Sequence, residues 1–554
     1  MTPLRLKFMK IKLFLVVILF ISAILRLWNL GGNPPGLTPD EAALGYNAYS
    51  ILKTGRDEYG QILPVVFKSF GDYKPGLYVY LTVPSVAIFG LTEFAVRFPS
   101  ALSGILIILL IYKIITLLTA HYRTSIAAAI IAALNPWLIT FSRGAWEANI
   151  TLTLTLVGIY FFLRALKEPF FMIYSSSFFS LTLLTYQGAK FSTAIVVAIF
   201  VLAYFKDLIK LPKKTLGIAG LVGLLISLPI IFSIFQGKAG RLEVFTIFSY
   251  PRPLIYTQNF LDEGQEKLGN PVYYLFHSET FNYARGIMGR WFNHFSGRFL
   301  FFEGDYANPR HSPPNMGILL HLELILLILG FVYLVNSKEK FKWFILPWLL
   351  LAPLPAVLSR DQVNAVRSIN MVVPLILISA FGTIYLFEML GRFKLKTLFC
   401  VVFCLFYILN FVYFLDSYFI HQPLHNAKYW YYGYKQVVNK VWLVRDNYKK
   451  TVIQQSYNQP YIYFLFYTRF DPARYQKQAN LVLSGPDVGL VDYVDNVEFK
   501  NLNLPDLRNQ NNYLIVADYA KIPDEVIKGI PEFYLLEDID YRSGDVAFRI
   551  IETK

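Results

Sequence analysis

The sequence predicts a mostly α-helical, polytopic membrane protein that carries a small soluble α/β domain at its C-terminal end. Apolar residues make up 55% of the 554 residues, and charged residues only 16%. Several apolar runs approach the roughly 20 residues that an α-helix needs to cross a bilayer. Beyond Asp416 these long runs stop, so we divide the chain into a membrane domain over residues 1–416 and a second domain over residues 417–554.

The apolar runs predict about eleven membrane crossings. They lie near residues 11–28, 99–119, 125–141, 150–166, 169–185, 190–205, 215–235, 317–335, 342–358, 371–389 and 396–416. The run Leu77–Leu91 is left out, because it has only about 15 residues and contains Pro84, which interrupts helical hydrogen bonding. We expect this run to form a helix on the outer surface of the membrane.

Basic residues give the predicted orientation. Positively charged segments stay in the cytoplasm, and four basic residues precede the first apolar run: Arg5, Lys7, Lys10 and Lys12. We interpret this run as an uncleaved first helix, because it is long and no clear small-residue cleavage site follows it. With Leu77–Leu91 on the surface, the later basic turns also face the cytoplasm, at residues 121–123, 164–167, 206–214, 338–342 and 392–396.

The remaining polar segments then lie on the extracytoplasmic side of a cell membrane. They are the first loop, a second loop around Arg143 and Glu147, the long loop Gln236–Met316, the segment Ser359–Arg367 and the C-terminal domain. Functional groups therefore collect on one side, as an enzyme that works at the outer leaflet requires.

The C-terminal domain is predicted to contain strands. Short apolar segments at 451–453, 513–517, 533–536 and 546–551 are separated by Pro, Gly and Asn turns, and Arg542–Asp545 indicates a hairpin. No catalytic constellation is found in this domain. We expect it to recognise an acceptor or only to stabilise the fold.

Acidic residues mark two places at the predicted outer surface. Asp40 and Glu41 follow the first span in Thr38–Glu41, where they either cap a helix or carry out chemistry. Glu147 stands at the outer end of another span, in Arg143–Glu147. An ionisable group at such a depth usually faces a partner or a cavity, and the simplest partner is Arg143, four residues earlier.

Basic residues on the same side suggest a substrate that carries phosphate. They are Lys74, which precedes the surface helix, and Arg97, Arg143, Lys190, Arg298, Arg310, His311, Arg360 and Arg367. In sugar transfer from a lipid phosphate, such cations hold the departing phosphate while one carboxylate takes the proton of the acceptor hydroxyl. Attack from the opposite face of the sugar inverts the anomeric carbon.

The order of these motifs resembles the GT-C glycosyltransferases, and most closely the branch of protein O-mannosyltransferases and lipid A aminoarabinose transferases. The resemblance covers roughly residues 1–400 and rests on four motifs, Thr38–Glu41, Tyr73–Leu77, Glu93–Ser100 and Ser142–Glu147. It implies a GT-C-like helical bundle and a polyprenyl-phosphate sugar as donor. It also implies a catalytic aspartate at Asp40, acidic partners at Glu41 and Glu147, and a phosphate-contacting lysine at Lys74.

Two departures from the family pattern leave alternatives open. Pro75–Gly76 stands where the family has two prolines, and Asp57–Glu58 offers a rival acid pair in the same loop. Another group, the aromatic and basic patch 292–314 with Arg310 and His311, is either a secondary donor or acceptor site or an interfacial belt. Asp305 and His311 match no zinc or calcium spacing, and no cofactor is predicted, since this branch does not clearly require a metal.

We therefore predict an inverting membrane glycosyltransferase with Asp40 as base, which moves a hexose or pentose to a hydroxyl of a protein, lipid or glycan. A transporter or flippase of lipid-linked sugars is the main alternative, but internal repeats and mid-membrane ionisable residues are not evident. A non-catalytic scaffold is a third. Membrane lipids are expected partners. Nucleic acid is not, because the net charge of +15 lies in short loops between apolar runs.

Overall fold

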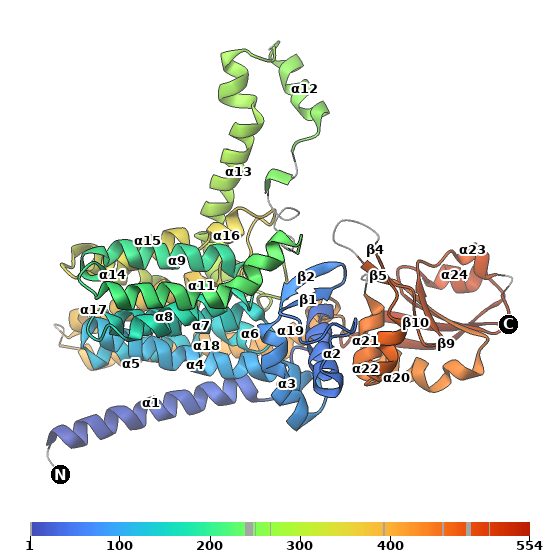
Figure 1. Cartoon of the computed structure of the whole chain (residues 1–554), viewed down its shortest axis with the longest axis horizontal. Helices are drawn as coiled ribbons and strands as arrows, with labels where there is room; N and C mark the ends of the chain where they lie inside the picture. The colour runs from blue at the N-terminus through green and yellow to red at the C-terminus, as the bar shows by residue number, and fades with distance from the viewer. Residues whose placement is uncertain are drawn as a thin grey trace.

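The protein is described by a computed structural model that covers residues 3–238, 247–249, 251–265, 267–391, 394–456, 459–483, 489–508 and 510–554. Long helices lie side by side in one bundle, and the β-sheet of the C-terminal part lies beyond one end of this bundle (Figure 1). The N-terminus lies at the opposite end. Arg392, in one of the predicted cytoplasmic turns, falls outside the described residues.

Each predicted span contains a helix. The bundle helices are α1 (Pro3–Leu27), α4 (Glu93–Thr119), α5 (Tyr122–Leu134), α6 (Pro136–Ser142), α7 (Glu147–Ala165), α8 (Phe171–Leu183), α9 (Ala189–Ala203), α11 (Lys213–Phe235), α14 (Glu323–Asn336), α15 (Lys342–Leu351), α17 (Val372–Leu390) and α18 (Lys396–Asp416). Within the described residues, five helices are long and apolar enough to cross a membrane by themselves, or six if α5 and α6 form one broken span. The chain is therefore a multi-pass membrane protein.

Five predicted spans are shorter or more broken than expected, two of them because α8 and α9 have only 13 and 15 residues. The span at 125–141 is divided into α5 and α6, whose axes differ by 55°. Pro136 disfavours a helical conformation at Asn135, whose side chain instead caps α6 by accepting a hydrogen bond from the Leu138 amide. Of the other two, α14 begins only at Glu323, and α15 is followed by the single turn α16 (Leu354–Val357).

The first loop after α1 folds at the end of the bundle that is nearest the sheet. It forms α2 (Pro39–Thr54), β1 (Val66–Ser69), β2 (Asp72–Pro75) and α3 (Leu77–Phe89). Helix α3, which contains the predicted surface segment, lies beside α2 and outside the row of long helices (Figure 1). Strands β1 and β2 pair antiparallel, with Lys74 opposite Phe67.

Gly76, which stands where the family pattern has a second proline, allows a tight turn after β2. The Gly76 amide donates a hydrogen bond to the Val65 carbonyl at 2.9 Å, which a proline cannot do. A Cβ atom at this position would lie 2.3 Å from the ring of Phe67. The glycine thus lets the chain approach the hairpin that carries Lys74.

The long outer loop forms an arm that projects sideways from the bundle (Figure 1). Its helical segments are α12 (Leu254–Glu263), the π-helix η2 (Tyr273–His277) and α13 (Glu279–His294), followed by η3 (Arg298–Phe302). From η3 the chain returns toward the bundle through the loop that contains Arg310 and His311.

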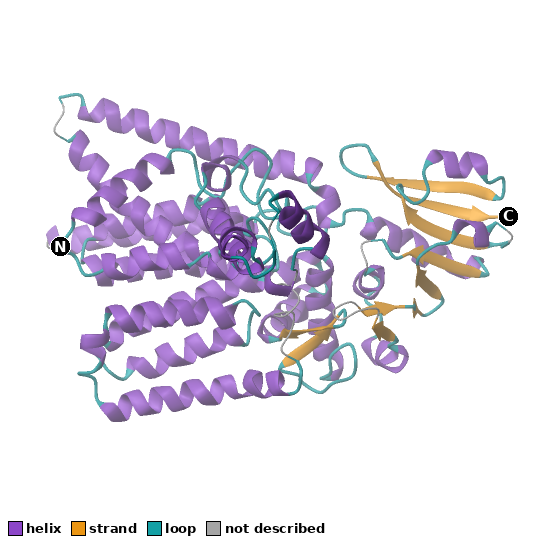
Figure 2. Ribbon diagram, turned by 90° about the horizontal axis from the view of Figure 1, so that it is seen from above, coloured by secondary structure: helices purple, strands orange, loops and turns teal. Residues whose placement is uncertain are grey.

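The C-terminal part is built on a six-stranded mixed sheet (Figure 2). Its strands have the order β6-β7-β3-β8-β10-β9, with β6 (Tyr493–Val494) at one edge. Strand β3 (Lys450–Gln454) lies parallel to both β7 (Val497–Lys500) and β8 (Tyr513–Asp518). The strands β9 (Phe533–Asp540) and β10 (Val546–Thr553) form the predicted hairpin. All four strands expected from the sequence are present. The helices are α20 (Tyr434–Val444), α21 (Pro460–Tyr467), α22 (Pro472–Gln478), α23 (Leu504–Leu507) and α24 (Asp524–Gly529).

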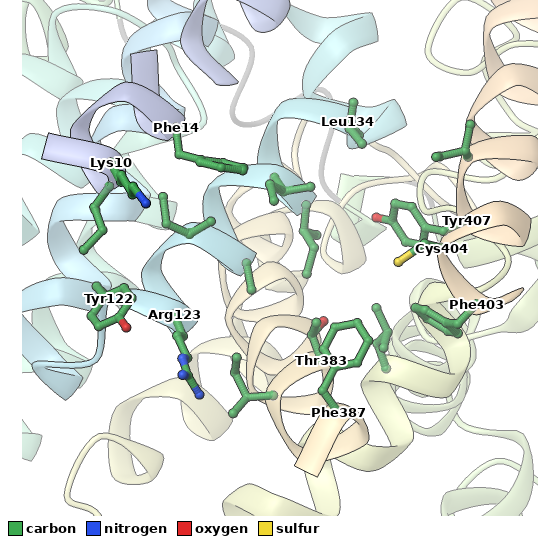
Figure 3. A pocket seen from close by; sticks show the side chains of 18 residues that line it. Lys10, Phe14, Tyr122, Arg123, Leu134, Thr383, Phe387, Phe403, Cys404 and Tyr407 are labelled. Atoms are coloured by element: carbon green, nitrogen blue, oxygen red, sulfur yellow. The ribbon is translucent and has the colours of Figure 1, made fainter. Parts of the chain in front are cut away.

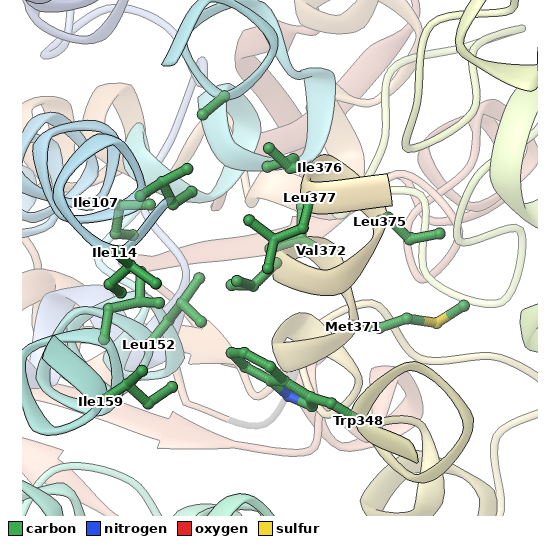
Figure 4. Close-up of a cluster of buried hydrophobic side chains, with 14 of the residues drawn as sticks. Ile107, Ile114, Leu152, Ile159, Trp348, Met371, Val372, Leu375, Ile376 and Leu377 are labelled. Atoms are coloured by element: carbon green, nitrogen blue, oxygen red, sulfur yellow. The ribbon is translucent and has the colours of Figure 1, made fainter. Parts of the chain in front are cut away.

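Two large apolar cores hold the structure together. One fills the bundle, where Ile107 and Ile114 of α4 meet Leu152 of α7, Trp348 of α15 and Ile376 of α17 (Figure 4). The other joins α2 and α3 to α20, α21 and the sheet. Since α21 packs directly on α2, the C-terminal part supports the helix that begins at the acidic pair.

Candidate active site

Of the two acidic residues at the start of α2, Glu41 has a structural role. The Thr38 side chain accepts a hydrogen bond from the Glu41 amide at 3.2 Å, and Glu41 Oε2 accepts one from the Thr38 amide at 3.0 Å, which completes a capping box. Glu41 Oε1 also accepts from the Ala145 amide at 2.9 Å and from Arg97 Nε at 3.0 Å. With only 3% of its surface exposed, Glu41 caps α2 and ties it to α4 and to the segment before α7.

Asp40 differs from its neighbour, because its side chain is 63% exposed and lines a cleft. Its carboxylate forms an ion pair with Lys74 of β2. Burial alone would lower the pKa of Lys74, but the nearby carboxylates of Asp40, Glu147 and Asp72 outweigh it and raise that pKa. Lys74 therefore remains a cation, and it keeps a positive charge beside Asp40.

Glu147 is the first residue of α7 and lines the same cleft. Its Oε1 atom is buried and finds no hydrogen-bond partner among the described residues. The local ion pair expected with Arg143 does not account for this carboxylate, because Arg143 donates to the carbonyls of Leu25 and Asn33, both at 2.9 Å. Glu147 is thus an acid held against the cleft by the start of a helix.

The cleft has a volume of about 370 Å³ and lies between α2, β2, the start of α7 and the loops that precede η4 (Ile369–Met371) and α14. It brings together seven residues predicted from the sequence: Asp40, Glu41, Lys74, Glu147, Arg310, His311 and Arg367. Carboxyl groups thus meet several basic side chains in one cavity at the sheet end of the bundle. This arrangement can hold an anionic group and accept a proton beside it.

Three other residues that were predicted to bind substrate lie outside the cleft: Arg97, Arg143 and Lys190. Arg97 is fully buried and donates to Glu41 and to the carbonyls of Leu30 and Pro34, at 3.1 and 3.0 Å. Arg97 and Arg143 both donate hydrogen bonds to acceptors inside the protein, and neither lines the cleft. Their predicted role as substrate ligands is therefore corrected. Lys190 does not line the cleft either.

Lys190 is linked through Gln187 to the strand β2, which borders the cleft. Its ammonium donates to Gln187 Oε1 at 2.7 Å, and the Gln187 amide donates to the Tyr73 carbonyl at 2.6 Å. Lys190 faces a second cavity, which lies between α7, α8, α9 and α11. Its position supports the strand that carries Lys74 and differs from the predicted contact with substrate.

The rival acids Asp57 and Glu58 do not line the cleft. Asp57 Oδ1 accepts from the amides of Tyr59 and Gln61, at 2.9 and 2.8 Å, and Glu58 Oε1 accepts from the Asn47 side chain at 3.0 Å. Burial raises the pKa of Glu58 to about 8. These acids shape the loop between α2 and β1, which leaves Asp40 as the exposed carboxylate of this segment.

The raised pKa of Glu58 predicts a pH-dependent stability. The folded protein keeps the Glu58 proton up to about pH 8, whereas the unfolded chain loses it near the ordinary value of 4.5, so stability falls as pH rises through this window. Glu58→Gln removes this titration but can keep the bond to Asn47. Between pH 5 and 8.5 we expect the melting temperature of the wild type to fall by at least about 2 °C more than that of the variant. Parallel melting curves in detergent would contradict this assignment.

Two further ionisable residues line the cleft, Tyr186 and Asp361, and neither was predicted from the sequence. Tyr186 lies in the turn between α8 and α9, and burial raises its pKa, which leaves a neutral hydroxyl near Arg367. Asp361 Oδ2 accepts from Arg367 Nη1 at 3.1 Å and so orients that guanidinium. The sequence placed Asp361 in the same outer segment as Arg367, but a turn tyrosine carries no recognisable signal.

A larger crevice of about 590 Å³ lies between α1, α5, α17 and α18 (Figure 3). Its lining is apolar apart from a few groups such as Lys10, Arg123, Thr383 and Tyr407, and it includes no carboxylate. Since Lys10 and Arg123 belong to the end of the bundle away from α2, this crevice is separate from the acidic cleft. Among the described residues, no three His, Cys, Asp or Glu side chains form a group that could hold a metal ion.

Comparisons with known proteins agree with the predicted fold. A family model described as dolichyl-phosphate-mannose-protein mannosyltransferase matches residues 73–232. No curated protein matches the chain. The structure of ArnT from Cupriavidus metallidurans bound to undecaprenyl phosphate is similar over 97% of both chains, with 11% sequence identity and a TM-score of 0.51.

A second similar structure is the archaeal oligosaccharyltransferase AglB from Archaeoglobus fulgidus, in complex with an inhibitory peptide and a dolichol-phosphate. The match covers 83% of this chain and 64% of that one, with 13% identity and a TM-score of 0.51. At such low identity the likeness shows the fold. The chain therefore has the GT-C glycosyltransferase fold, and the resemblance inferred from its motifs is confirmed.

Proposed function

We propose that this GT-C protein is an integral membrane glycosyltransferase, which moves a sugar from a polyprenyl-phosphate donor to an acceptor hydroxyl on the extracytoplasmic side of the cell membrane. The observation that carries this proposal is the exposed Asp40 carboxylate, paired with Lys74 in a cleft that also contains Arg310, His311 and Arg367. The GT-C fold supports the same class of reaction. A transporter or flippase of lipid-linked sugars is not favoured.

In the proposed reaction Asp40 is the base. It takes the proton of the acceptor hydroxyl, whose oxygen forms a bond to the anomeric carbon while the bond from that carbon to the phosphate oxygen breaks. The electrons of that bond leave with the polyprenyl phosphate. Because nucleophile and leaving group occupy opposite faces of the sugar, the configuration at the anomeric carbon inverts.

Lys74, Arg310 and Arg367 are proposed to bind the donor phosphate. Lys74 is paired with Asp40, so an incoming phosphate competes for the ammonium and frees the carboxylate for the acceptor hydroxyl. Asp361 holds the Arg367 guanidinium in place. Asp40 and Asp72 keep Lys74 charged, whereas burial raises the pKa of Glu147 to about 8 and keeps that acid largely protonated near neutral pH. Glu41 positions Asp40 by fixing the first turn of α2.

We extend the proposal to the topology. Eleven crossings, a cytoplasmic N-terminus and an extracytoplasmic domain over residues 417–554 place the cleft outside, because α2 lies at the sheet end of the bundle. Short helices in predicted spans, such as the 13-residue α8, lie in the bundle beside longer ones, and α8 packs against α7 and α11 (Figure 1). Helix α8 extends over about 20 Å, less than the roughly 30 Å hydrocarbon core, so its flanking turns complete the crossing.

Removal of divalent metal is expected to leave turnover within about twofold of the untreated enzyme. The positive charge that a metal supplies to a departing phosphate is supplied here by Lys74 and the arginines of the cleft. The measurement is release of polyprenyl phosphate by purified protein with and without EDTA. Loss of turnover that Mg²⁺ or Mn²⁺ restores would show that the basic side chains are not sufficient.

The proposed function itself is tested with purified protein, a polyprenyl-phosphate sugar and a mixture of acceptor hydroxyl compounds. We expect the donor to be consumed and polyprenyl phosphate to be released. A transporter would move the donor across a reconstituted bilayer without cleaving it. A scaffold protein would do neither, and it would also tolerate the loss of Asp40.

A further inference from the structure

A buried acid-imidazole pair stands in the wall of the cleft. His311 Nδ1 lies 2.6 Å from Asp305 Oδ2. Asp305 is fully buried, and His311 keeps only 5% of its surface exposed. The proposed mechanism so far uses His311 only as one of several basic groups, and it uses Asp305 not at all.

The contacts of Asp305 fix the direction of this hydrogen bond. Asp305 Oδ2 also accepts from the Ala365 amide at 2.7 Å, and Asp305 Oδ1 accepts from the Asn308 amide at 3.1 Å. The Asn308 side-chain amide donates to Oδ1 as well, at 3.3 Å. Since its other partners are N–H donors, the carboxylate acts as acceptor, and His311 Nδ1 is the fourth donor. The second ring nitrogen, Nε2, is therefore the one left for the cleft.

Aromatic contacts fix the plane of the imidazole. The His311 ring meets the Trp146 ring edge to face, with 5.1 Å between centroids, and lies 5.8 Å from the ring of Phe141. No described residue forms a hydrogen bond with Nε2, while the ring lines the cleft that holds Asp40 and Lys74.

We propose that His311 is a catalytic residue, which as an imidazolium donates its Nε2–H to an oxygen of the departing phosphate, and that Asp305 is the positioning residue that keeps the ring charged and oriented. This inference rests on the proposed function. The phosphate gains one negative charge when the sugar-phosphate bond breaks, so the hydrogen bond from a cation strengthens toward the transition state. The proton of the acceptor hydroxyl still goes to Asp40.

The proposal predicts a falling rate at high pH, where His311 loses its charge. Other ionisable groups also face the cleft and contribute to the field there: Asp40 and Glu41 from α2, Lys74 from β2, Glu147 from α7, Tyr186 from the α8–α9 turn, Arg310 from the same loop, and Asp361 and Arg367 from the segment before η4. The variant Asp305→Asn leaves these groups in place and removes the charge behind the ring, while its NH2 group can no longer accept from Asn308, a loss that the melting temperature reports. Its amide oxygen can still accept from Nδ1–H, so the orientation of the ring is retained.

The test is the pH dependence of kcat with a polyprenyl-phosphate sugar, measured for wild type, Asp305→Asn and His311→Gln. We expect the alkaline limb of the wild-type profile to move to lower pH by about 1 unit or more in Asp305→Asn, with little change of kcat on the acid side. His311→Gln should lower kcat by about 100-fold and lose this limb. Melting temperatures and binding of polyprenyl phosphate show whether each variant is folded.

Three results would overturn the proposal: a wild-type profile without an alkaline limb, an unshifted limb in Asp305→Asn, or full turnover by His311→Gln. A wild-type profile without an alkaline limb would overturn the proposal even if both variants fail to fold. If the wild type consumes donor and Asp40→Asn does not, while His311→Gln is fully active, only this inference fails. If the wild type consumes no donor with any acceptor, the proposed function fails as well.

Discussion

Replacement of Asp40 by asparagine is expected to lower sugar transfer by about 10³-fold or more, because an amide cannot take the proton of the acceptor hydroxyl. The helix should persist, since Thr38 and Glu41 form the capping box of α2 and Asp40 does not belong to it. Binding of polyprenyl phosphate should be retained or become tighter, because Lys74 loses the carboxylate that competes with the phosphate. Release of polyprenyl phosphate gives kcat, and titration with the lipid gives affinity.

The matched control is Asp57→Asn. Asp57 belongs to the rival acid pair of the same loop, but its carboxylate accepts amides within the loop and does not line the cleft. An asparagine oxygen can make these bonds too, so activity should stay within about threefold. Equal losses in both variants would indicate a general disturbance of the loop, and full activity of Asp40→Asn would remove Asp40 from the mechanism.

Replacement of Lys74 by methionine is expected to lower kcat/KM for the donor by about 10²- to 10³-fold. Methionine keeps the apolar stem but loses the ammonium, which faces Asp40 and whose charge is maintained by Asp40 and Asp72. The donor phosphate then meets carboxylates without their counter-charge. Kinetics over a range of donor concentrations separate the loss of affinity from the loss of rate.

Lys190→Met provides the comparison for Lys74→Met. Lys190 carries the same charge and lies on the same predicted side, but it bonds Gln187 and does not line the cleft. We expect a loss of at most about fivefold, which is the cost of a weaker support for β2. Similar losses in the two variants would mean that the donor phosphate lies elsewhere.

The bundle could be predicted from the sequence because hydropathy and loop charge act locally. Each apolar run became a helix. The placement of Leu77–Leu91 on the membrane surface stays a prediction, because bundle helices such as the 13-residue α8 are as short as α3. The break between α5 and α6 was also readable, since Asn135–Pro136 is a helix stop followed by a helix start. It was missed because the apolar run continues across it.

The cleft was only partly predictable, because burial depends on contacts between distant segments. Glu41 and Arg97 are 56 residues apart and satisfy each other inside the protein. In the sequence, each is only a charged residue in an outer segment, like Asp40 and Lys74. The same holds for Arg143, whose partners are main-chain carbonyls, and these leave no trace in residue types.

The central claim is that Asp40 works at the extracytoplasmic face, and labelling from one side of the membrane tests it most directly. Both natural cysteines, Cys400 and Cys404, are first replaced by serine. A single cysteine then reports either the exposed loop between α2 and β1, in Gln61→Cys, or the exposed turn between α14 and α15, in Lys340→Cys. We expect a membrane-impermeant maleimide added to intact cells or right-side-out vesicles to label Gln61→Cys and to leave Lys340→Cys unlabelled, and the pattern to reverse in inside-out vesicles. Labelling of Gln61→Cys only from the cytoplasmic side would contradict the account.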